Sequence, residues 1–536
     1  MRKIYISACL LGALLLTNCH DELDKTNPNF VTTENYFKTA GELQLATNSI
    51  YSVIASNNLV AREWFFTHVL RSPDYASGGA QLEAPRAQIL NGGTTPDNGL
   101  LNAIWSNLYI VIHRANTVIA NASNVTDNAT LRDATVAEAQ FLRAWAYYEL
   151  VNFFGAVPLY TEPVAAVDAF KPRTAVADIY KLIEADLKAA QTGLPATRSG
   201  DNLGRVTSGA ATFLLGKSYM QQGVAMYPQA KTELTKLVGR YSLVSNYSDN
   251  FREETEYNAE SIWEVGFQGR SDNGYNWGAE GNGATAARAS VRNQEINPIS
   301  WRNLIPSNEY LNEFETTAKG SPKTDPRLDY SVYFPVKGDK LASAADLGIG
   351  ITGDQFGPAS NRQDMTEALQ GGAGTSIING TPIKVSWEKY TNLYKSAEGF
   401  QPAGINTRVM RYAEVLLLLA EIENEQGNQT AALGYLNQLR NRPSVMMPTY
   451  PNALYPASTK EQVFAAIRHE NQVERGGEEG RDFDVFRWLK QGKIANPFKT
   501  YTFNPARDFV LPIPQDEISR NPQLGSGGID RQNPNY

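Results

Sequence analysis

Apolar residues recur every three or four positions over several long stretches of this chain, which is the spacing of one face of an α-helix. Thr39 and Glu42 form a capping box ahead of such a stretch, so we expect a helix over residues 39–56. A longer apolar stripe predicts a second helix and consists of Leu101, Ile104, Trp105, Leu108, Ile112, Ala115 and Ile119. Residues 138–154 are apolar nearly all round and predict a buried helix that ends at Gly155.

Two later segments, 207–240 and 408–441, each show two helical patterns around a glycine, Gly223 in the first and Gly427 in the second. They resemble the tetratricopeptide repeat, whose period is about 34 residues, although unrelated antiparallel helix hairpins would give nearly the same architecture. Thr174 is expected to cap a further helix.

The region from about 245 to 405 has a different pattern. Asn, Gly, Ser and Pro interrupt it, and only short strand-like pieces such as 261–267 and 383–387 stand out. A loop-rich segment of this size is costly to order and usually carries function. We therefore expect ligand contacts there.

The amino terminus has the layout of a signal peptide, because a short apolar run follows Arg2 and Lys3 and is less than the roughly 20 residues that a membrane-spanning helix needs. Residues 16–19 resemble the bacterial lipobox, in which the peptide is cut before a lipid-modified cysteine, here Cys19; an ordinary secretory cleavage site is the alternative. The expected order is a signal peptide (1–18), a lipidated tether (19–38), a helical region (39–240), a loop-rich region (241–405) and a C-terminal helical region (406–536).

The composition excludes several classes of function. The 536 residues are 42% hydrophobic and 20% charged, and the net charge of -7 lacks the basic excess typical of nucleic-acid binding. The four histidines show no metal-ligand spacing, and His113 is expected to be a structural residue of the long helix. No nucleophile elbow or phosphate-binding loop is present.

The densest acidic cluster is a candidate for glycoside hydrolysis, which uses two carboxylates about 5–9 Å apart. It consists of Glu474, Glu478, Glu479, Asp482 and Asp484, with Arg475, Arg481 and Arg487 among them. Pairing with arginine keeps a carboxyl group ionised, whereas a general acid needs a raised pKa. We therefore favour an ion-paired corner over a catalytic pair.

Aromatic residues on polar loops are the remaining candidates for function. Trp277, Tyr275 and Asn276 lie in a Gly- and Asn-rich stretch, and Asp74 and Tyr75 lie in a second one. Sugars pack their C–H faces on such rings, while neighbouring amides and carboxylates bind the hydroxyls. These five residues are the predicted ligand contacts. A Trp on a loop can alternatively cover the hydrophobic core as a lid. Trp64 is expected to be packed in the interior.

Several motifs, spread over some 500 residues, resemble in their order the SusD/RagB family of Bacteroidetes outer-membrane lipoproteins. Besides the lipobox, they are Ala137–Tyr148 with Phe154–Leu159, Gly204–Thr207, Arg411–Val415, Glu474-Arg475 with Glu479–Asp484, Leu511–Ile518, Asn521-Pro522 and Asn533–Tyr536. The resemblance implies a mainly α fold of four tetratricopeptide-like helix pairs, with a loop-rich ligand-binding insertion and a few short strands.

The resemblance also implies a function. Members are non-catalytic, cell-surface glycan-binding lipoproteins that partner a SusC-like TonB-dependent transporter in nutrient uptake, and some bind peptide instead of sugar. We therefore expect a protein anchored in the outer membrane through Cys19, without a catalytic residue or cofactor. A peptide-binding member of the family and a glycoside hydrolase remain the alternatives. The sequence leaves a structural Ca²⁺ open, since no EF-hand spacing is present.

Overall fold

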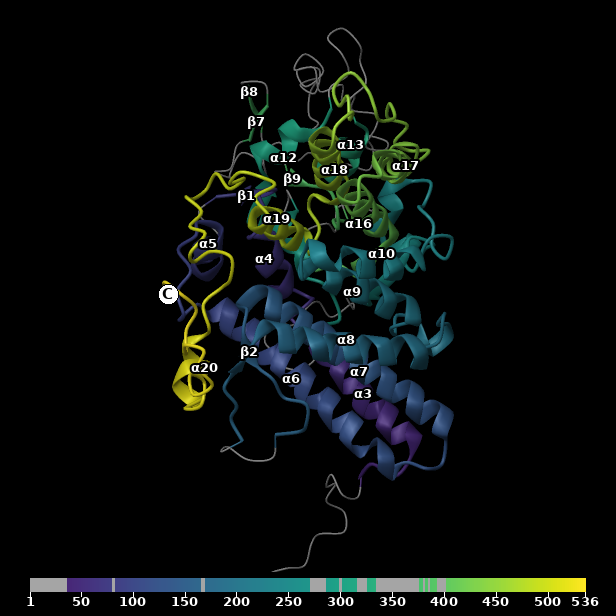
Figure 1. Cartoon of the computed structure of the whole chain (residues 1–536), viewed down its shortest axis with the longest axis vertical. Coiled ribbons are helices and arrows are strands. Elements are labelled where there is room, and N and C mark those ends of the chain that lie inside the picture. Colours follow the sequence, from purple (N-terminus) through teal and green to yellow (C-terminus); the bar gives the residue numbers. More distant parts are fainter. Residues whose placement is uncertain are drawn as a thin grey trace, which may run out of the picture.

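Helices dominate the computed structural model, and Figure 1 shows them stacked along most of the length of the molecule. The structure describes residues 36–79, 82–164, 169–269, 286–297, 301–315, 325–333, 376–378, 381–383, 386–392 and 402–536. The predicted class, a mainly α scaffold of helix pairs with a few short strands, is confirmed.

The N-terminal helical layer contains the long helices that the apolar stripes predict. Its helices are α3 (Ala40–Ile54), α4 (Glu63–Val69), α5 (Ala84–Leu90), α6 (Gly99–Asn121), α7 (Ala129–Phe154), α8 (Val176–Gly193), α9 (Ser208–Gln221) and α10 (Tyr227–Thr235). The capping box of α3 is present, since the Thr39 hydroxyl accepts a hydrogen bond from the Glu42 amide. Helix α7 ends at Gly155, whose φ of 72° suits glycine. It packs on α6 and α8.

Two predictions for this layer are wrong. Thr174 belongs to a two-residue strand and does not cap α8, whose N-cap is Ala175. His113 lies on the exposed side of α6, because the helix turns its neighbour Ile112 toward the core. Trp64 is packed as predicted, with 2% of its surface exposed.

The C-terminal helices continue the stack. They are α16 (Tyr412–Glu425), α17 (Gln429–Arg440), α18 (Lys460–Arg475), α19 (Arg481–Lys490) and α20 (Gln515–Arg520). The two predicted helix pairs are α9 with α10 and α16 with α17, and each pair is in contact. Gly223 and Gly427 follow the first helix of their pairs with φ of 109° and 84°, the left-handed conformation that permits the tight turn.

The segments between the two helical regions contribute short helices and two-stranded sheets. The short helices are α11 (Arg292–Ile296), α12 (Asn308–Glu313) and α13 (Arg327–Ser331). The antiparallel strand pairs are β1 (Tyr75–Ser77) with β5 (Leu304–Pro306), β2 (Val157–Pro158) with β3 (Arg173–Thr174), β4 (Ser261–Val265) with β10 (Thr407–Arg411), β6 (Val332–Tyr333) with β9 (Ser386–Trp387), and β7 (Ser376–Ile378) with β8 (Thr381–Ile383). Strand β4 falls within the predicted 261–267.

One large hydrophobic core runs through both helical regions. Aromatic contacts connect distant elements within it: the ring of Trp263 on β4 lies 5.7 Å from that of Trp145 on α7, edge to face. The apolar run at 415–419 is part of this core. In the described part of the chain, no helix is both long and apolar enough to cross a membrane.

Candidate functional site

Three of the five predicted ligand residues, Tyr275, Asn276 and Trp277, lie outside the described residues, and so does Cys19. They stay predictions. The structure does place Asp74 and Tyr75, the other two, and it brings them to the junction of β1 with the C-terminal helices.

Tyr75 and Asp74 are both buried and bound to the protein. Tyr75 is 3% exposed, and its hydroxyl donates a hydrogen bond to the Gly477 carbonyl at 2.9 Å. Asp74 is 1% exposed, accepts hydrogen bonds from Ser72 and Gln472, and lies 3.1 Å from Nη1 of Arg481. Both residues therefore fix the β1 segment to α18 and α19.

A double glycine between α18 and α19 makes room for this junction. The Tyr75 ring lies 4.5 Å from that of Trp387, which in turn lies 4.9 Å from Tyr310. At Gly477, which has a φ of 85°, a Cβ atom would stand 2.6 Å from the Trp387 ring. Only glycine permits both this backbone conformation and the close approach of the ring.

A chamber of about 390 Å³ lies beside this aromatic group. Strands β1 and β5 form part of it, and its polar lining includes Ser72, Ser77, Ser307, Asn308, Lys499 and Thr500. The side of Tyr75 belongs to the lining although little of the ring is exposed. Hydroxyl and amide groups around an aromatic ring are suited to a polar organic ligand.

Sequence reasoning missed Trp301, which is 38% exposed and stands just before β5. Its ring centroid lies 6.0 Å from the Arg62 guanidinium carbon. Arg62 is held in place by Glu295 at 2.6 Å and Glu83 at 3.0 Å. Asn297 and Asn303 flank Trp301 in the sequence, so the same pattern of a loop aromatic between amides that selected Trp277 also marks this residue.

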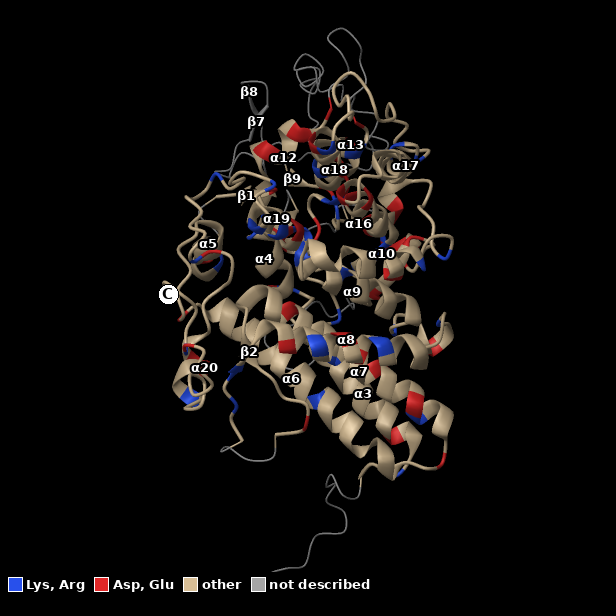
Figure 2. Cartoon of the chain, in the orientation of Figure 1, with Lys and Arg blue, Asp and Glu red and all other residues tan. Residues whose placement is uncertain are grey.

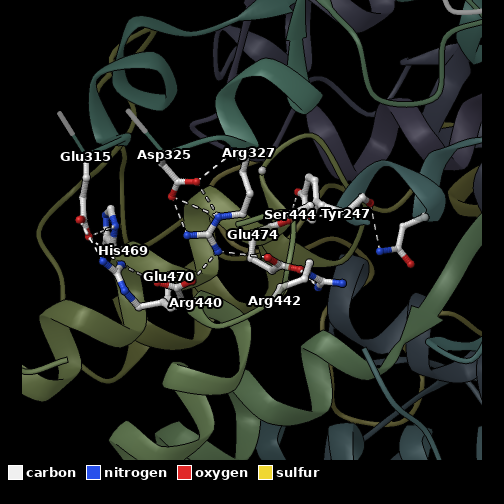
Figure 3. Close-up of polar contacts among 12 residues, drawn as sticks. Tyr247, Glu315, Asp325, Arg327, Arg440, Arg442, Ser444, His469, Glu470 and Glu474 are labelled. Atoms are coloured by element: carbon white, nitrogen blue, oxygen red, sulfur yellow. Dashed lines mark hydrogen bonds and ion pairs between the residues drawn. The ribbon is translucent and has the colours of Figure 1, made fainter. Parts of the chain in front are cut away.

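Buried ion pairs hold the loop segments that carry these groups. Glu474 on α18 faces three arginines from different segments: Arg411 and Arg442, each at 2.8 Å, and Arg327 at 3.1 Å. Figure 3 shows Glu474 between Arg327 and Arg442. Burial alone raises a carboxyl pKa, but the three arginines hold the pKa of Glu474 well below its usual range.

The same network extends to His469 and the segment after α12. His469 contacts Glu313 at 3.0 Å and Glu315 at 3.2 Å, and Arg440 binds Glu315 at 2.7 Å (Figure 3). Burial opposes protonation of His469, but the hydrogen bonds to the two glutamates raise its pKa to about 9. Glu315 is correspondingly held at a pKa of about 2, since the hydrogen bonds of His469 and Arg440 outweigh its burial.

The predicted ion-paired corner at 474–484 is confirmed, but most of its partners come from far along the chain. Glu478 binds Arg411 at 2.6 Å and Glu479 binds Arg292 at 2.8 Å. Asp482 lies 2.7 Å from His68, and only Asp484 pairs with the neighbouring Arg475 and Arg487. Figure 2 shows acidic and basic segments intermixed around α16, α18 and α19. Among the described residues, no group of three or more His, Cys, Asp or Glu side chains is arranged to hold a metal ion.

Two family models together match most of the chain. The model described as SusD family matches residues 259–536. A second one, described as starch-binding associating with outer membrane, matches residues 23–220. The matched ranges include α3 to α8 and α16 to α20, and they leave out α10.

One named relative matches nearly the whole chain, and another matches two thirds of it. SusD-like protein P2 of Formosa agariphila is 25% identical over 542 residues, which covers 98% of this chain and 99% of that protein. The starch-binding protein SusD of Bacteroides thetaiotaomicron is 24% identical over 374 residues, 66% of each chain. A solved structure described as a laminarin binding SusD-like protein has a TM-score of 0.70 at 24% identity and covers 93% of this chain and 100% of that one.

Proposed function

We propose that this chain, which belongs to the SusD family, binds oligosaccharides at the cell surface without transforming them and passes them to a SusC-like TonB-dependent transporter. One family model is described as starch-binding associating with outer membrane, and a relative is described as a starch-binding protein. The lipobox at Cys19 supports a lipid anchor, because the several acyl chains of a bacterial lipoprotein hold a protein firmly on a membrane.

The observation that carries glycan binding is the exposed indole of Trp301 beside the Arg62 guanidinium. A flat ring offers a packing surface to the C–H face of a sugar, and a guanidinium donates hydrogen bonds to its hydroxyls. The relatives described as binding starch and laminarin support the same ligand class. Trp277, Tyr275 and Asn276 stay proposed ligand contacts in addition to Trp301, and so does the side of Tyr75 that lines the chamber.

Binding without catalysis is supported by the state of the acidic cluster. Arg411 binds both Glu474 and Glu478. Burial raises the pKa of Glu478, but Arg411 and Lys389 lower it overall. A general acid for glycoside hydrolysis needs the opposite shift.

Native gels that contain a polysaccharide test this proposal. Retardation by at least one glycan of a panel that includes laminarin and starch is expected, and Trp301→Ala should abolish or strongly reduce it. Met446→Ala is the matched control, because Met446 is also a large exposed apolar residue (62%) and lies on the loop between α17 and α18. Binding by none of the glycans would reject the glycan assignment, and retention of a peptide library instead would favour the peptide-binding alternative.

Two further measurements separate the remaining functions. Release of shorter sugars from a bound glycan, lost in Glu479→Gln, would establish a glycoside hydrolase and reject the proposal of binding alone. Purification of the detergent-solubilised protein should recover an outer-membrane barrel as its partner. If no barrel accompanies a correctly anchored protein, the transporter part of the proposal fails.

A further inference from the structure

A cleft of about 1030 Å³ lies between α12, α18, α19 and the segment 492–499, and nothing in the proposed function uses it. One face of α18 forms a wall, because Glu461, Phe464, Arg468 and Gln472 follow each other at helical spacing and all line the cleft. Trp301 is not among the residues that line it. The volume is at the upper end of the range for small-ligand sites.

Arg481 lines this cleft, and one donor of its guanidinium group has no acceptor in the described part of the protein. The Arg481 side chain is only 2% exposed, and Asp74 is its one ion-pair partner among the described residues. Its Nη1 atom lies 3.1 Å from Asp74 Oδ2, whereas Nε is buried and has no hydrogen-bond acceptor within the described part of the protein. A buried donor without an acceptor is unfavourable, and a ligand that supplies an acceptor would remove this cost.

Some basic side chains that line the cleft are not paired with its acidic side chains. Five basic and four acidic residues line it: Lys460, Arg468, Arg481, Lys493, Lys499, Glu309, Glu313, Glu425 and Glu461. Glu425 is bound by both Lys460 and Lys493, and Glu313 by His469. In the described structure, Arg468 and Lys499 take part in no ion pair.

The remaining acids stand away from the centre of this wall. Glu461 precedes Arg468 by seven residues, about 10 Å along the helix axis. Arg468 and Arg481 lie close to the same carboxylate: burial raises the pKa of Glu313, but the hydrogen bond from His469 and the charges of Arg468 and Arg481 lower it overall. Glu309 lies on the opposite wall, on α12. The cleft thus has an end that is rich in hydrogen-bond donors, at Arg468 and Arg481.

An apolar surface adjoins this end. Phe464 is half-buried, and its ring stands edge-on to Trp488 with centroids 5.5 Å apart and planes at 89°. Ile494 and Pro497 line the same cleft. A half-buried ring held by a second ring offers a rigid platform for a sugar ring, as loop aromatics do elsewhere.

We propose that this cleft is a second glycan-binding site, specific for an oligosaccharide that carries an anionic substituent, a uronate carboxylate or a sulfate ester. The anion binds at Arg468 and Arg481, whose guanidinium groups suit planar, bidentate contacts with oxyanions, and a neighbouring sugar ring packs on Phe464. The inference rests on the proposed function only in taking the ligand to be a glycan.

Isothermal titration of the mature chain with three tetrasaccharides tests the site: tetragalacturonate, a sulfated carrageenan tetrasaccharide and neutral laminaritetraose. At least one of the two anionic probes should bind about tenfold more tightly than the neutral one, and more weakly at high salt. The anionic probe that binds more tightly shows whether the site recognises a carboxylate or a sulfate. Equal affinity for all three probes would overturn the anion specificity.

Variants locate the site. Arg468→Gln should weaken binding of the anionic probe about tenfold, because one charge-assisted hydrogen bond is lost, and Phe464→Ala should weaken it as well. Arg468 is exposed, so its replacement leaves the fold intact. Arg520→Gln is the matched control, since this exposed arginine lies on α20, far from α18 in Figure 1. Arg481→Lys keeps the charge beside Asp74 and tests the guanidinium geometry alone.

The two proposals fail in different ways. If Trp301→Ala removes binding of the anionic probe while Arg468→Gln and Phe464→Ala leave it unchanged, the cleft is not a second site and the proposed function stands. If Trp301→Ala leaves binding of the anionic probe intact while the cleft variants weaken it, the second site is established. If none of the three probes binds at millimolar concentration, the proposal of a second site is overturned. The polysaccharide gels then decide the proposed function.

Discussion

The N-terminal helical layer and the C-terminal ion-paired region are stabilised by different forces. In the layer, α6 and α7 bury Leu108 and Trp145 against neighbouring helices, and apolar contacts dominate. In the C-terminal region, the single carboxylate of Glu474 contacts three arginines in the protein interior. The layer contains single buried ion pairs such as Arg143 with Asp186, whereas the C-terminal region is joined by a network of them.

The two regions use different interactions because they position different kinds of segment. Long helices present continuous apolar stripes and can pack along their whole length. Arg327 begins the short helix α13, Arg411 ends the strand β10, and Arg442 lies in the turn after α17. These segments have no long apolar stripe, so directional contacts to α18 fix their positions. Buried ion pairs are geometrically demanding, and removal of one partner leaves an uncompensated charge. This suits a ligand-bearing face, whose short segments must be placed precisely on the scaffold.

The largest effect is expected where the charge network is broken. Glu474→Ala leaves Arg327, Arg411 and Arg442 without their common partner and should lower the free energy of unfolding by about 3–5 kcal/mol. Denaturant unfolding measures it, with the exposed Glu461→Ala on the same helix as control. A loss below about 1 kcal/mol would show that the network is not what holds this region.

A cavity in the apolar layer should cost slightly less. Leu108→Ala removes a side chain that is 0% exposed and is expected to lower the free energy of unfolding by about 3 kcal/mol. Unlike the pH response of the ion-paired region, this loss should be the same at pH 6 and pH 10. A strongly pH-dependent loss would contradict the division between the two regions.

Alkali should act on both regions, because His469 in the ion-paired region and His68 on α4 are buried histidines that each have a pKa of about 9. His469 has a folded pKa of about 9 against an ordinary value of 6.5, so its stabilisation is complete below pH 6.5 and is lost as the pH rises through 9. It contributes up to about 3 kcal/mol. Unfolding measured at pH 6 and pH 10 should show this loss, and His469→Gln should reduce the difference. The exposed His113→Gln serves as control.

Removal of a helix cap should have a smaller effect. Thr39→Ala deletes the side-chain acceptor of the α3 capping box and is expected to cost about 1 kcal/mol in the free energy of unfolding. Thr39→Ser keeps the acceptor and should restore most of the loss. No difference between the two variants would mean that the box does not stabilise α3.

The smallest effect is expected at a surface ion pair. Lys181 and Asp178 on α8 lie 2.7 Å apart with side chains 77% and 51% exposed. Asp178→Ala should change the free energy of unfolding by less than about 1 kcal/mol, because water screens exposed charges. Together with Glu474→Ala it tests whether burial, and not the mere presence of opposite charges, gives the C-terminal network its strength.

Periodicity alone was enough to predict the long helices and both helix pairs, because the 3.6-residue repeat is a local property of the chain. The ends of α3 and α7 follow from a capping box and a glycine that are visible in the sequence. Local pattern was not enough for Thr174, where pairing with Val157 in a two-residue strand takes precedence over helix capping. It also did not show on which side of α6 His113 would lie.

The candidate sites depended more on tertiary structure. The sequence identified the residue types, acids among arginines and aromatic rings among amides, but Arg411 reaches Glu478 across 67 positions and Arg292 reaches Glu479 across 187. Tyr75 and Trp301 have similar polar surroundings in the sequence, yet one is enclosed by Trp387 and Gly477 and the other is exposed. The long-range packing of the chain decides which ring faces solvent and which charge is neutralised, and no local pattern encodes that packing.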